Sequence, residues 1–351
     1  MIVRLVGSEM CIRDRVYVRG NARDFDRWAE MGATGWDYQS VLPYFKKAQC
    51  ADEGRHSDNF RGSEGPLGTT TGPMKNPLYG AFLRACKEAG HAYTHDLNGA
   101  QQEGFGPMPM TVAQGKRSST SRSYLRPVKD RRNLQVLTQA QVQRIEMRGN
   151  QAVCVEVMLK GQIERLTAAK EILLCAGAIN SPQLLMLSGI GPGAHLHAMG
   201  LETLVDSPQV GQNLMDHLEV YVQQACTEPV SLHKHLGLLG RAKIGVQWLT
   251  THKGLGATNH FEVGGFVRSD PSQAQPDIQF HFLPTAMSYD GTAKAKGHGF
   301  QVHVGPMLPK SRGAITLRST RPSDPPKIVF NYMSHEAVSY THLRAHETYD
   351  H

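Results

Sequence analysis

Residues 171–191 read EILLCAGAINSPQLLMLSGIG. The apolar run at residues 171–175 predicts a strand that is buried on both faces. Three small residues, 176–178, follow it, and we expect a helix from Ser181 to Leu187. Small side chains let another molecule approach the backbone closely, and a helix N-terminus offers free N–H groups to an anion. The stretch therefore fits a nucleotide cofactor, although a tight strand-to-helix turn packed on its own core would look the same.

A glycine-rich segment closes this helix. Residues 189–193 read GIGPG, which resembles a phosphate-binding loop. A dinucleotide fingerprint must follow a strand and open a helix, whereas this segment ends a helix. We therefore interpret it as a helix C-terminus and turn. Neither GxGxxG nor a Walker A sequence occurs in the chain.

The pattern of the sequence changes near residue 134. Helical patterns dominate before this point, and alternating, strand-like patterns are more frequent after it. Residues 91–115 form a long irregular stretch, and a loop of that length usually has a functional role or covers a site. The expected helices are residues 24–31, 37–50, 77–89, 118–126 and 236–249, and the expected strands are residues 134–137, 142–147, 152–159, 163–166, 171–175, 218–226, 260–267, 278–283, 300–307, 314–317 and 328–330. The predicted fold class is α+β, with an α/β half followed by an antiparallel half.

Composition narrows the function classes. The chain has 351 residues, of which 40% are hydrophobic and 20% charged, which excludes a disordered or fibrous protein and suggests about two domains. No apolar run approaches the roughly 18 residues that a membrane span needs. Six cysteines form no CxxC pair, so neither a disulfide framework nor a zinc site is indicated. The net charge of +7 is a mild excess, typical of a slightly basic enzyme.

Other polar groups give weaker signals. Residues 210–217 read VGQNLMDH, a pattern that could orient a cofactor or cap an ordinary turn. Two HxH steps, at residues 195–197 and 233–235, have no carboxylate or Cys placed with them, which favours surface histidines over a metal site. GxSxG is absent, so a serine hydrolase is unsupported. A basic run fits a solvated face or a cofactor phosphate better than nucleic acid; it comprises Arg117, Arg122, Arg126, Lys129, Arg131 and Arg132.

The two ends of the chain differ from the rest. Residues 1–15 read MIVRLVGSEMCIRDR, and residues 338–351 read VSYTHLRAHETYDH. Both resemble translated adaptor sequence, which flanks reading frames in short-read assemblies, and frayed natural termini are the alternative. The first stretch lacks the apolar region and cleavage site of a signal peptide. We therefore expect both stretches to be sequencing artefacts and leave them out of the fold.

Taken together, the motifs resemble the glucose-methanol-choline (GMC) family of flavin-dependent oxidoreductases. The segment GAINSPQLLMLSGIG, residues 177–191, matches a signature of that family at every constrained position. Within the family, the resemblance is strongest to the choline-oxidising members of bacteria. The supporting segments are residues 16–29, 35–49, 96–108, 115–125, 210–217, 257–266 and 330–336.

The resemblance implies FAD as the cofactor. The residues implied to line it are Val142, Cys175, Ala176, Gly177, Asn213, Asp216 and His217. The resemblance also implies FAD-domain portions at residues 16–217 and a substrate-binding portion at residues 218–337. It places the glycine-rich FAD fingerprint of the missing Rossmann unit upstream of Val16 and the catalytic histidine downstream of Ala337. No catalytic residue is therefore assigned, and we expect a central fragment of a longer enzyme, inactive and unable to retain FAD by itself.

Choline is the implied substrate. A quaternary ammonium cannot donate a hydrogen bond and is held by aromatic faces and a carboxylate. Glu262, flanked by Phe261 and Phe266, is the candidate carboxylate, with Trp248 as a possible cage wall. Glu262 could equally be a structural strand residue.

Three interpretations of function remain open: an FAD-dependent choline dehydrogenase that serves glycine betaine synthesis, another GMC alcohol oxidoreductase, or a truncated chain with no activity of its own. We expect no nucleic-acid partner and a bacterial location in the cytoplasm or peripherally at the inner membrane. The electron acceptor cannot be read from the sequence.

Overall fold

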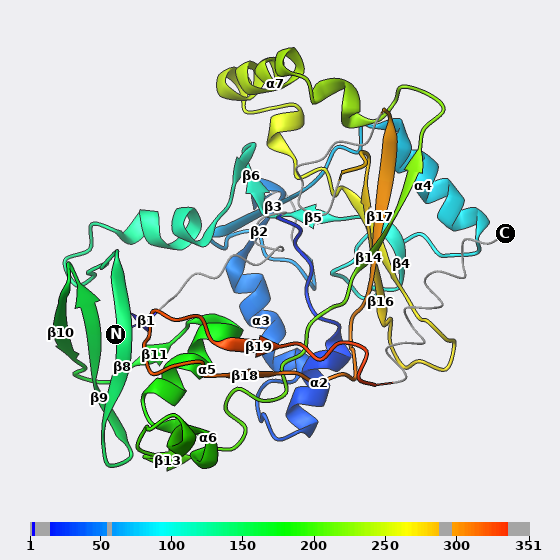
Figure 1. Ribbon diagram of the computed structural model, residues 1–351. Helices are drawn as coiled ribbons and strands as arrows, with labels where there is room; N and C mark the ends of the chain where they lie inside the picture. Colours follow the sequence, from blue (N-terminus) through cyan, green and yellow to red (C-terminus); the bar gives the residue numbers. More distant parts are fainter. Residues whose placement is uncertain (1, 4–14, 55–57, 288–296, 336–351) are drawn as a thin grey trace. The chain divides into compact units, whose positions relative to one another are not determined.

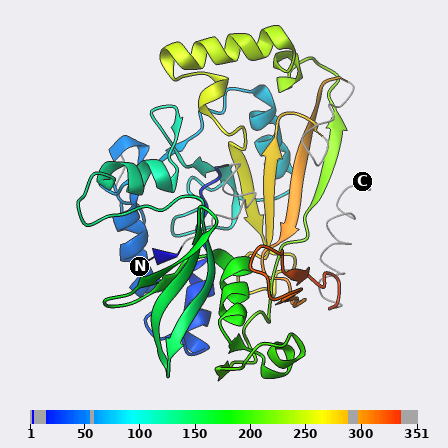
Figure 2. The ribbon, with the colours of Figure 1, turned by 60° about the vertical axis from the view of Figure 1, so that its left-hand side comes forward.

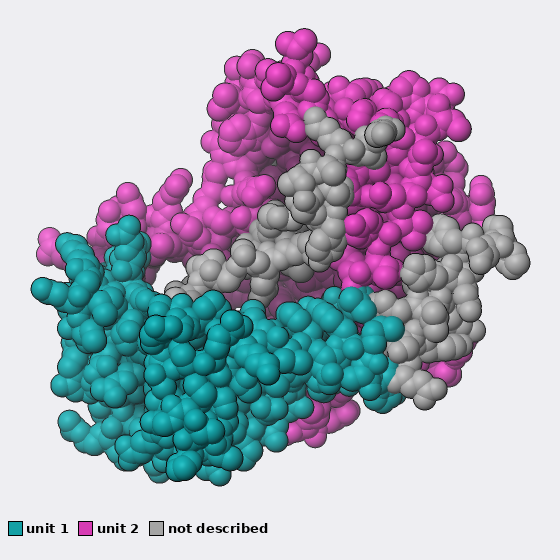
Figure 3. Space-filling model, viewed as in Figure 1, with its two compact units in different colours: residues 1–9, 135–218, 309–343 teal, residues 10–134, 219–308, 344–351 magenta. Residues whose placement is uncertain are grey.

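The computed structural model describes residues 2–3, 15–54, 58–287 and 297–335. The chain divides into two compact units (Figure 3). Unit 1 consists of residues 1–9, 135–218 and 309–343, and unit 2 consists of residues 10–134, 219–308 and 344–351. Each unit therefore combines segments that are far apart in the sequence.

The predicted domains followed the order of the sequence, with a boundary at residues 217–218. The compact units also separate near this point, but residues 16–134 group with residues 219–308 rather than with residues 135–217. The functional assignment of the two domains stays a prediction. The proposed artefact at residues 338–351, and most of that at residues 1–15, lies outside the described residues.

Unit 1 is built around a three-stranded antiparallel sheet and one helix (Figure 1). The sheet has the order β10-β9-β8, and the 149–150 turn that joins β8 to β9 was predicted. Helix α5 packs against β8, where Leu184 joins a core cluster with Ile145, Val155 and Val157. The elements are β8 (Ala140–Arg148), β9 (Gln151–Leu159), β10 (Gln162–Thr167), α5 (Gly177–Leu187) and α6 (Gly193–Ala198), with the short strands β1 (Ile2–Val3), β11 (Leu173–Leu174), β12 (Ile190–Gly191), β13 (Val205–Asp206), β18 (Ala314–Thr316) and β19 (Lys327–Val329).

The structure corrects two predictions for residues 171–191. The strand is only β11, and its side chains alternate: Ile172 and Leu174 pack on the core, whereas Leu173 is exposed. The strand is therefore not buried on both faces. Helix α5 begins at Gly177 rather than at Ser181. Gly177 has a φ of +80°, which glycine adopts without strain, so the chain can turn directly from the strand into the helix.

Unit 2 contains a five-stranded antiparallel sheet of order β14-β17-β16-β15-β4 (Figure 2). Helix α4 covers one face, where the Phe82 and Phe282 rings stack with centroids 4.6 Å apart. Asn76 caps this helix and Pro77 is its first residue, as predicted. The elements are α4 (Pro77–Glu88), β4 (Gly104–Pro107), β14 (Val220–Ala225), β15 (Val263–Val267), β16 (Ile278–Leu283) and β17 (Gly299–Pro306).

The remaining elements of unit 2 lie before the strands of this sheet in the sequence or connect those strands. Asp37 caps α3 through Ser40, as predicted, whereas α2 is capped by Asn21 and begins two residues before the expected helix. The 118–126 helix is replaced by a π-helical turn, η2, and a 3-10 turn, η3. The elements are α2 (Ala22–Glu30), α3 (Tyr38–Ala48), β2 (Gln49–Ala51), η1 (Asp52–Gly54), β3 (Leu67–Thr71), β5 (Pro109–Met110), β6 (Val112–Ala113), β7 (Lys116–Arg117), η2 (Ser121–Leu125), η3 (Arg126–Val128), η4 (Leu232–His235), α7 (Leu238–Thr251) and η5 (Leu255–Ala257).

Two further predictions were wrong. Residues 134–137 form no strand. Residues 91–115 are not simply irregular, because they supply the edge strand β4 and the short strands β5 and β6. The sequence did not predict β4 because its residues, Gly-Phe-Gly-Pro, include glycine and proline, which are depleted in strands. The strand is stabilised by its pairing with β15.

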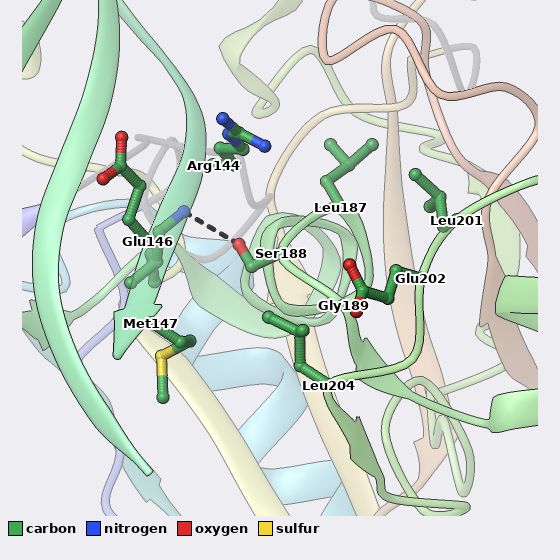
Figure 4. A pocket seen from close by; sticks show the side chains of 10 residues that line it. Arg144, Glu146, Met147, Leu187, Ser188, Gly189, Leu201, Glu202 and Leu204 are labelled. Atoms are coloured by element: carbon green, nitrogen blue, oxygen red, sulfur yellow. Dashed lines mark hydrogen bonds between the residues drawn. The ribbon is translucent and has the colours of Figure 1, made fainter. Parts of the chain in front are cut away.

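We expect Ser188→Ala to lower the free energy of unfolding by about 1–2 kcal/mol, because it leaves a buried N–H without its partner. Ser188 Oγ accepts from the Ile145 N–H at 2.8 Å, the dashed line in Figure 4. It also donates to the Leu184 carbonyl at 2.6 Å. Urea denaturation measures the change. Thr250→Ala removes an exposed hydroxyl that bonds the Val246 carbonyl and is expected to cost much less. Equal losses in the two variants would contradict the role given to Ser188.

Candidate cofactor and substrate sites

The turn from β11 into α5 exposes the start of a helix in unit 1. The N-cap position is Ala176, which has no side-chain cap, and its own N–H is held by Ser181 Oγ at 3.2 Å. Ala176 is buried, but Cys175 and Gly177 are exposed, and nothing lies within 4 Å of the place where a Cβ on Gly177 would stand. The first N–H groups of α5 are therefore open to an anionic ligand that approaches the backbone closely.

The 213–217 segment of unit 1 presents polar groups from an anchored turn. Leu214 fixes the turn by pairing with Gly313 and packing beside α5 residues. Asn213 has a φ of +59° and donates from Nδ2 to Gln209 at 2.8 Å. Asp216 accepts a hydrogen bond from the Tyr332 hydroxyl, and His217 is exposed. The turn fixes the backbone while its polar side chains stay at the surface.

Val142 completes the predicted cofactor residues. It lies on β8 opposite Val157, just before a β-bulge, and packs on the same cluster as Leu184 of α5. All seven predicted residues thus belong to unit 1, in which α5 contributes residues to two different core clusters. Their contact with a cofactor stays a prediction.

One face of the unit 2 sheet is apolar, and the other face carries a polar region on β14, β16 and β17. Alternate residues of β14, β16 and β17 pack under α4, and the residues between them face the other way. On that second face Tyr221, His303 and His281 are direct neighbours across three strands. All three are half-buried, and Glu219 Oε1 contacts Nδ1 of His303.

Phe261 joins this polar region. Its ring lies edge-on to the rings of His281 and His303, with centroid distances of 6.1 and 5.8 Å. Tyr221 packs at a shallower angle on His303, at 5.5 Å. The result is a half-buried aromatic cluster of Tyr221, Phe261, His281 and His303, with the Glu219 carboxylate at its edge.

Glu262 follows Phe261 directly and is 3% exposed. Its Oε2 accepts from the Met74 N–H at 2.5 Å, and its Oε1 accepts from the Thr258 hydroxyl at 2.6 Å. Gly72 makes room for it, since a Cβ there would lie 2.4 Å from the Glu262 Cγ. The two hydrogen bonds therefore hold the Glu262 carboxylate in one orientation. Burial of Tyr79, together with the nearby Glu262 carboxylate, raises the pKa of the Tyr79 hydroxyl.

Two predicted substrate residues have other contacts. Phe266 is 1% exposed and packs with Leu97 and Met108 in a core cluster. Trp248 is half-buried on α7 and donates from Nε1 to the Gly115 carbonyl at 2.7 Å. These contacts account for both side chains, and a role in substrate binding stays a prediction for them.

Sequence reasoning missed Glu219, Tyr221, His281 and His303. Their signal was present in the strands, because polar or aromatic residues alternate with Val220 and Val222, with Phe280 and Phe282, and with Val302 and Val304. Assigning every apolar position to one face would have left these four residues together on the other face. Among the described residues, no group of three His, Cys, Asp or Glu is placed to hold a metal ion.

The family model described as GMC oxidoreductase matches residues 4–219. The chain belongs to the GMC oxidoreductase family. Two curated relatives have the name oxygen-dependent choline dehydrogenase: that of Brucella anthropi is 50% identical over 333 residues, and that of Rhizobium meliloti is 49% identical over 332. Each alignment covers 95% of this chain and 60% of the relative. This GMC chain therefore spans about three fifths of the length of those relatives.

Solved structures agree on the fold. Formate oxidase from Aspergillus oryzae matches 96% of this GMC chain with a TM-score of 0.87 at 24% identity, covering 64% of that enzyme. Pyridoxine 4-oxidase from Mesorbium loti matches 95% with a TM-score of 0.81 at 28% identity, covering 62% of that enzyme. The GMC family is a family of FAD flavoproteins, and the open start of α5 with its exposed glycine fits a dinucleotide phosphate.

His260 gives the stability of the chain a pH dependence. Burial lowers the pKa of His260 below its ordinary value of 6.5. As the pH falls, His260 is therefore protonated in the unfolded chain before it is protonated in the folded chain. The contribution of His260 to stability decreases below about pH 6.5 and does not change with pH above that value. The loss from this one group cannot exceed about 1.4 kcal/mol per pH unit.

We expect His260→Asn to reduce the loss of stability between about pH 7 and about pH 5. Asn suits the position because His260 has a φ of +66°, and Asn adopts that region more easily than most residues. Urea denaturation at a series of pH values measures the slope. The exposed His197 is the control, and a slope that His197→Asn lowers as much as His260→Asn would contradict the assignment.

Proposed function

We propose that the protein containing this chain is an FAD-dependent alcohol dehydrogenase that oxidises choline to betaine aldehyde. The observation that carries the proposal is the half-buried aromatic cluster of unit 2 with the Glu219 carboxylate at its edge. Glu262, which follows Phe261 in the sequence, is the second carboxylate of the proposal. Aromatic faces and carboxylates together bind a quaternary ammonium, which needs negative potential but no hydrogen-bond acceptor. The names of the relatives support the same substrate.

Each side chain of the cluster has a part in this proposal. Phe261 and Tyr221 supply ring faces to the trimethylammonium group, and the fixed carboxylate of Glu262 supplies charge. In this proposal the Nδ1–H of His303 donates to the Glu219 carboxylate. The other ring nitrogen, Nε2, accepts from the Gln301 amide at 2.5 Å. Because both ring nitrogens are engaged, His303 serves as a wall of the site rather than as the base.

The seven residues of unit 1 are proposed to hold the cofactor. Bound FAD supplies the hydride acceptor, chemistry that no amino-acid side chain offers. The N–H groups at the start of α5 and the small residues Ala176 and Gly177 would receive the dinucleotide, and Val142 would contact it through the backbone. Asn213, Asp216 and His217 would contact it from the neighbouring turn.

A substrate panel tests the proposal. The flavin-loaded enzyme that contains this segment is assayed with choline, its uncharged isostere 3,3-dimethylbutan-1-ol, and benzyl alcohol. A kcat/KM for choline at least about tenfold above that for the isostere is expected, a difference of about 1.4 kcal/mol from charge recognition. Preference for an uncharged alcohol would instead support another GMC alcohol oxidoreductase.

A flavin-binding measurement tests the chain itself. The purified 351-residue chain is incubated with FAD and desalted, and the flavin absorbance is compared with the protein absorbance. We expect no stoichiometric flavin, because the glycine-rich fingerprint that binds the pyrophosphate in dinucleotide enzymes does not occur in these residues. Stoichiometric yellow flavin would overturn that expectation and show that these residues suffice.

We further propose that the protein works in a bacterial cytoplasm or peripherally at the inner membrane. The named relatives are bacterial. In the described part of the chain, no helix has the length and apolar character needed to cross a membrane.

A further inference from the structure

Helix α7 carries a large apolar face that is exposed. Leu238, Leu239, Val246 and Leu249 are 86%, 89%, 61% and 70% exposed. At about 100° per residue these four side chains fall within an arc of about 100° on the helix. Figures 1 and 2 both show α7 at the periphery of unit 2.

The opposite side of α7 fixes this orientation. Ile244 and Trp248 are half-buried there, and the Trp248 indole donates to the Gly115 carbonyl. The helix then ends at His252, whose N–H bonds the Trp248 carbonyl and whose φ of +53° turns the chain away. The apolar face of α7 therefore points outward, because the other side of the helix is attached to the rest of unit 2.

The surroundings of this face are basic. Residues 229–261 contain no Asp or Glu and four Lys or Arg residues, which are Lys234, Arg241, Lys243 and Lys253. On the helix, Arg241 and Lys243 lie on the two sides of the apolar arc, each within about 60° of its edge. An apolar stripe with a cation on each side is typical of helices that lie in the interface of an anionic bilayer.

We propose that α7 docks this face into the surface of a membrane that contains anionic lipids. The leucines would enter the boundary between headgroups and acyl chains, and Arg241 and Lys243 would meet lipid phosphates. A second copy of the chain is a poorer occupant, because a twofold contact would bring the same cations together. With 14 residues, α7 is too short to span the roughly 30 Å apolar layer.

This inference rests on the peripheral location proposed above and is independent of the choline chemistry. Vesicle binding is measured without activity, so the failure of one leaves the other standing. The test is flotation of the 351-residue chain with vesicles of phosphatidylcholine alone and with vesicles of equal parts phosphatidylcholine and phosphatidylglycerol. Circular dichroism confirms that each variant is folded.

We expect binding to the anionic vesicles and much less to phosphatidylcholine. Leu239→Ser with Leu249→Ser should weaken it at least about tenfold, through lost apolar burial. Arg241→Glu with Lys243→Glu should weaken it about thirtyfold or more, since each cation near such a surface contributes about fivefold. Lys87→Glu with Lys170→Glu is the charge control, and Ile163→Ser is the apolar control, because these residues are exposed elsewhere.

Three results would overturn the proposal. The first is a folded chain that does not float with anionic vesicles. The second is flotation that persists in both α7 variants, which would place the lipid contact on another surface. The third is dimerisation that the leucine variant abolishes in the absence of vesicle binding, which would make a second copy the occupant.

Discussion

Replacing Glu262 with Gln is expected to raise KM for choline about 100-fold, which corresponds to about 2.7 kcal/mol, and to change KM for 3,3-dimethylbutan-1-ol by less than about threefold. The reason is that the two substrates have nearly the same shape and differ in charge. Gln fits the position, because its carbonyl oxygen can accept from the Met74 N–H and the Thr258 hydroxyl can turn to accept from its amide. Steady-state kinetics of the flavin-loaded enzyme measure both constants.

Glu103→Gln is the matched control for this substitution. Glu103 is a more exposed carboxylate of the same unit and pairs with Arg268, so its loss should leave KM for both alcohols unchanged. If Glu262→Gln raised KM for both alcohols alike, Glu262 would be a structural residue. The alternative left open by the sequence would then hold.

Replacing Gly115 with Ala is expected to lower the free energy of unfolding of the chain by about 3 kcal/mol or more. Gly115 has a φ of +67°, and a Cβ there would lie 1.7 Å from the His252 carbonyl oxygen. The left-handed backbone alone costs an alanine about 1–2 kcal/mol, and the overlap with backbone atoms forces a further shift. Since the Gly115 carbonyl also receives the Trp248 indole, we expect the attachment of α7 to loosen first.

The midpoint of urea denaturation measures this loss. Gly90→Ala is the control, because Gly90 also has a positive φ, +86°, but nothing lies within 4 Å of its missing Cβ. It should cost only the 1–2 kcal/mol or so of backbone strain. Equal losses of unfolding free energy in Gly90→Ala and Gly115→Ala would mean that the close approach of His252 to residue 115 adds no further cost.

The sequence predicted elements whose signals are local. The caps Asp37 and Asn76 begin α3 and α4, and the 149–150 turn joins two strands, because each depends on residues within one turn of chain. Strand β16 was predicted with its observed bounds from period-two alternation. The family was also recognisable from residues 177–191 together with the supporting segments, and the match to residues 4–219 confirms it.

Where predictions failed, distant contacts outweighed local preference. Strand β4 exists because β15 pairs with it from about 160 residues away in the chain, a separation that no local pattern reports. The strand predicted at residues 171–175 was expected to be buried because its residues are apolar. The structure has a strand only at residues 173–174 with Leu173 exposed, because burial depends on what covers each face. Helix α5 began early because a glycine with a positive φ can turn a strand directly into a helix.

The sequence by itself determined the family, FAD as the cofactor of that family and the choice of Glu262 as a candidate, since these depend on which residues follow one another. Only the tertiary structure decided that Met74, 188 residues away, holds that carboxylate, and that Tyr221, His281 and His303 stand side by side on one face of a sheet. It also decided that the leucines of α7 point outward while Trp248 attaches the helix. The physical reason is that a linear pattern specifies periodicity and residue type, whereas the partner of each face is set by which strands and loops meet when the chain closes on itself.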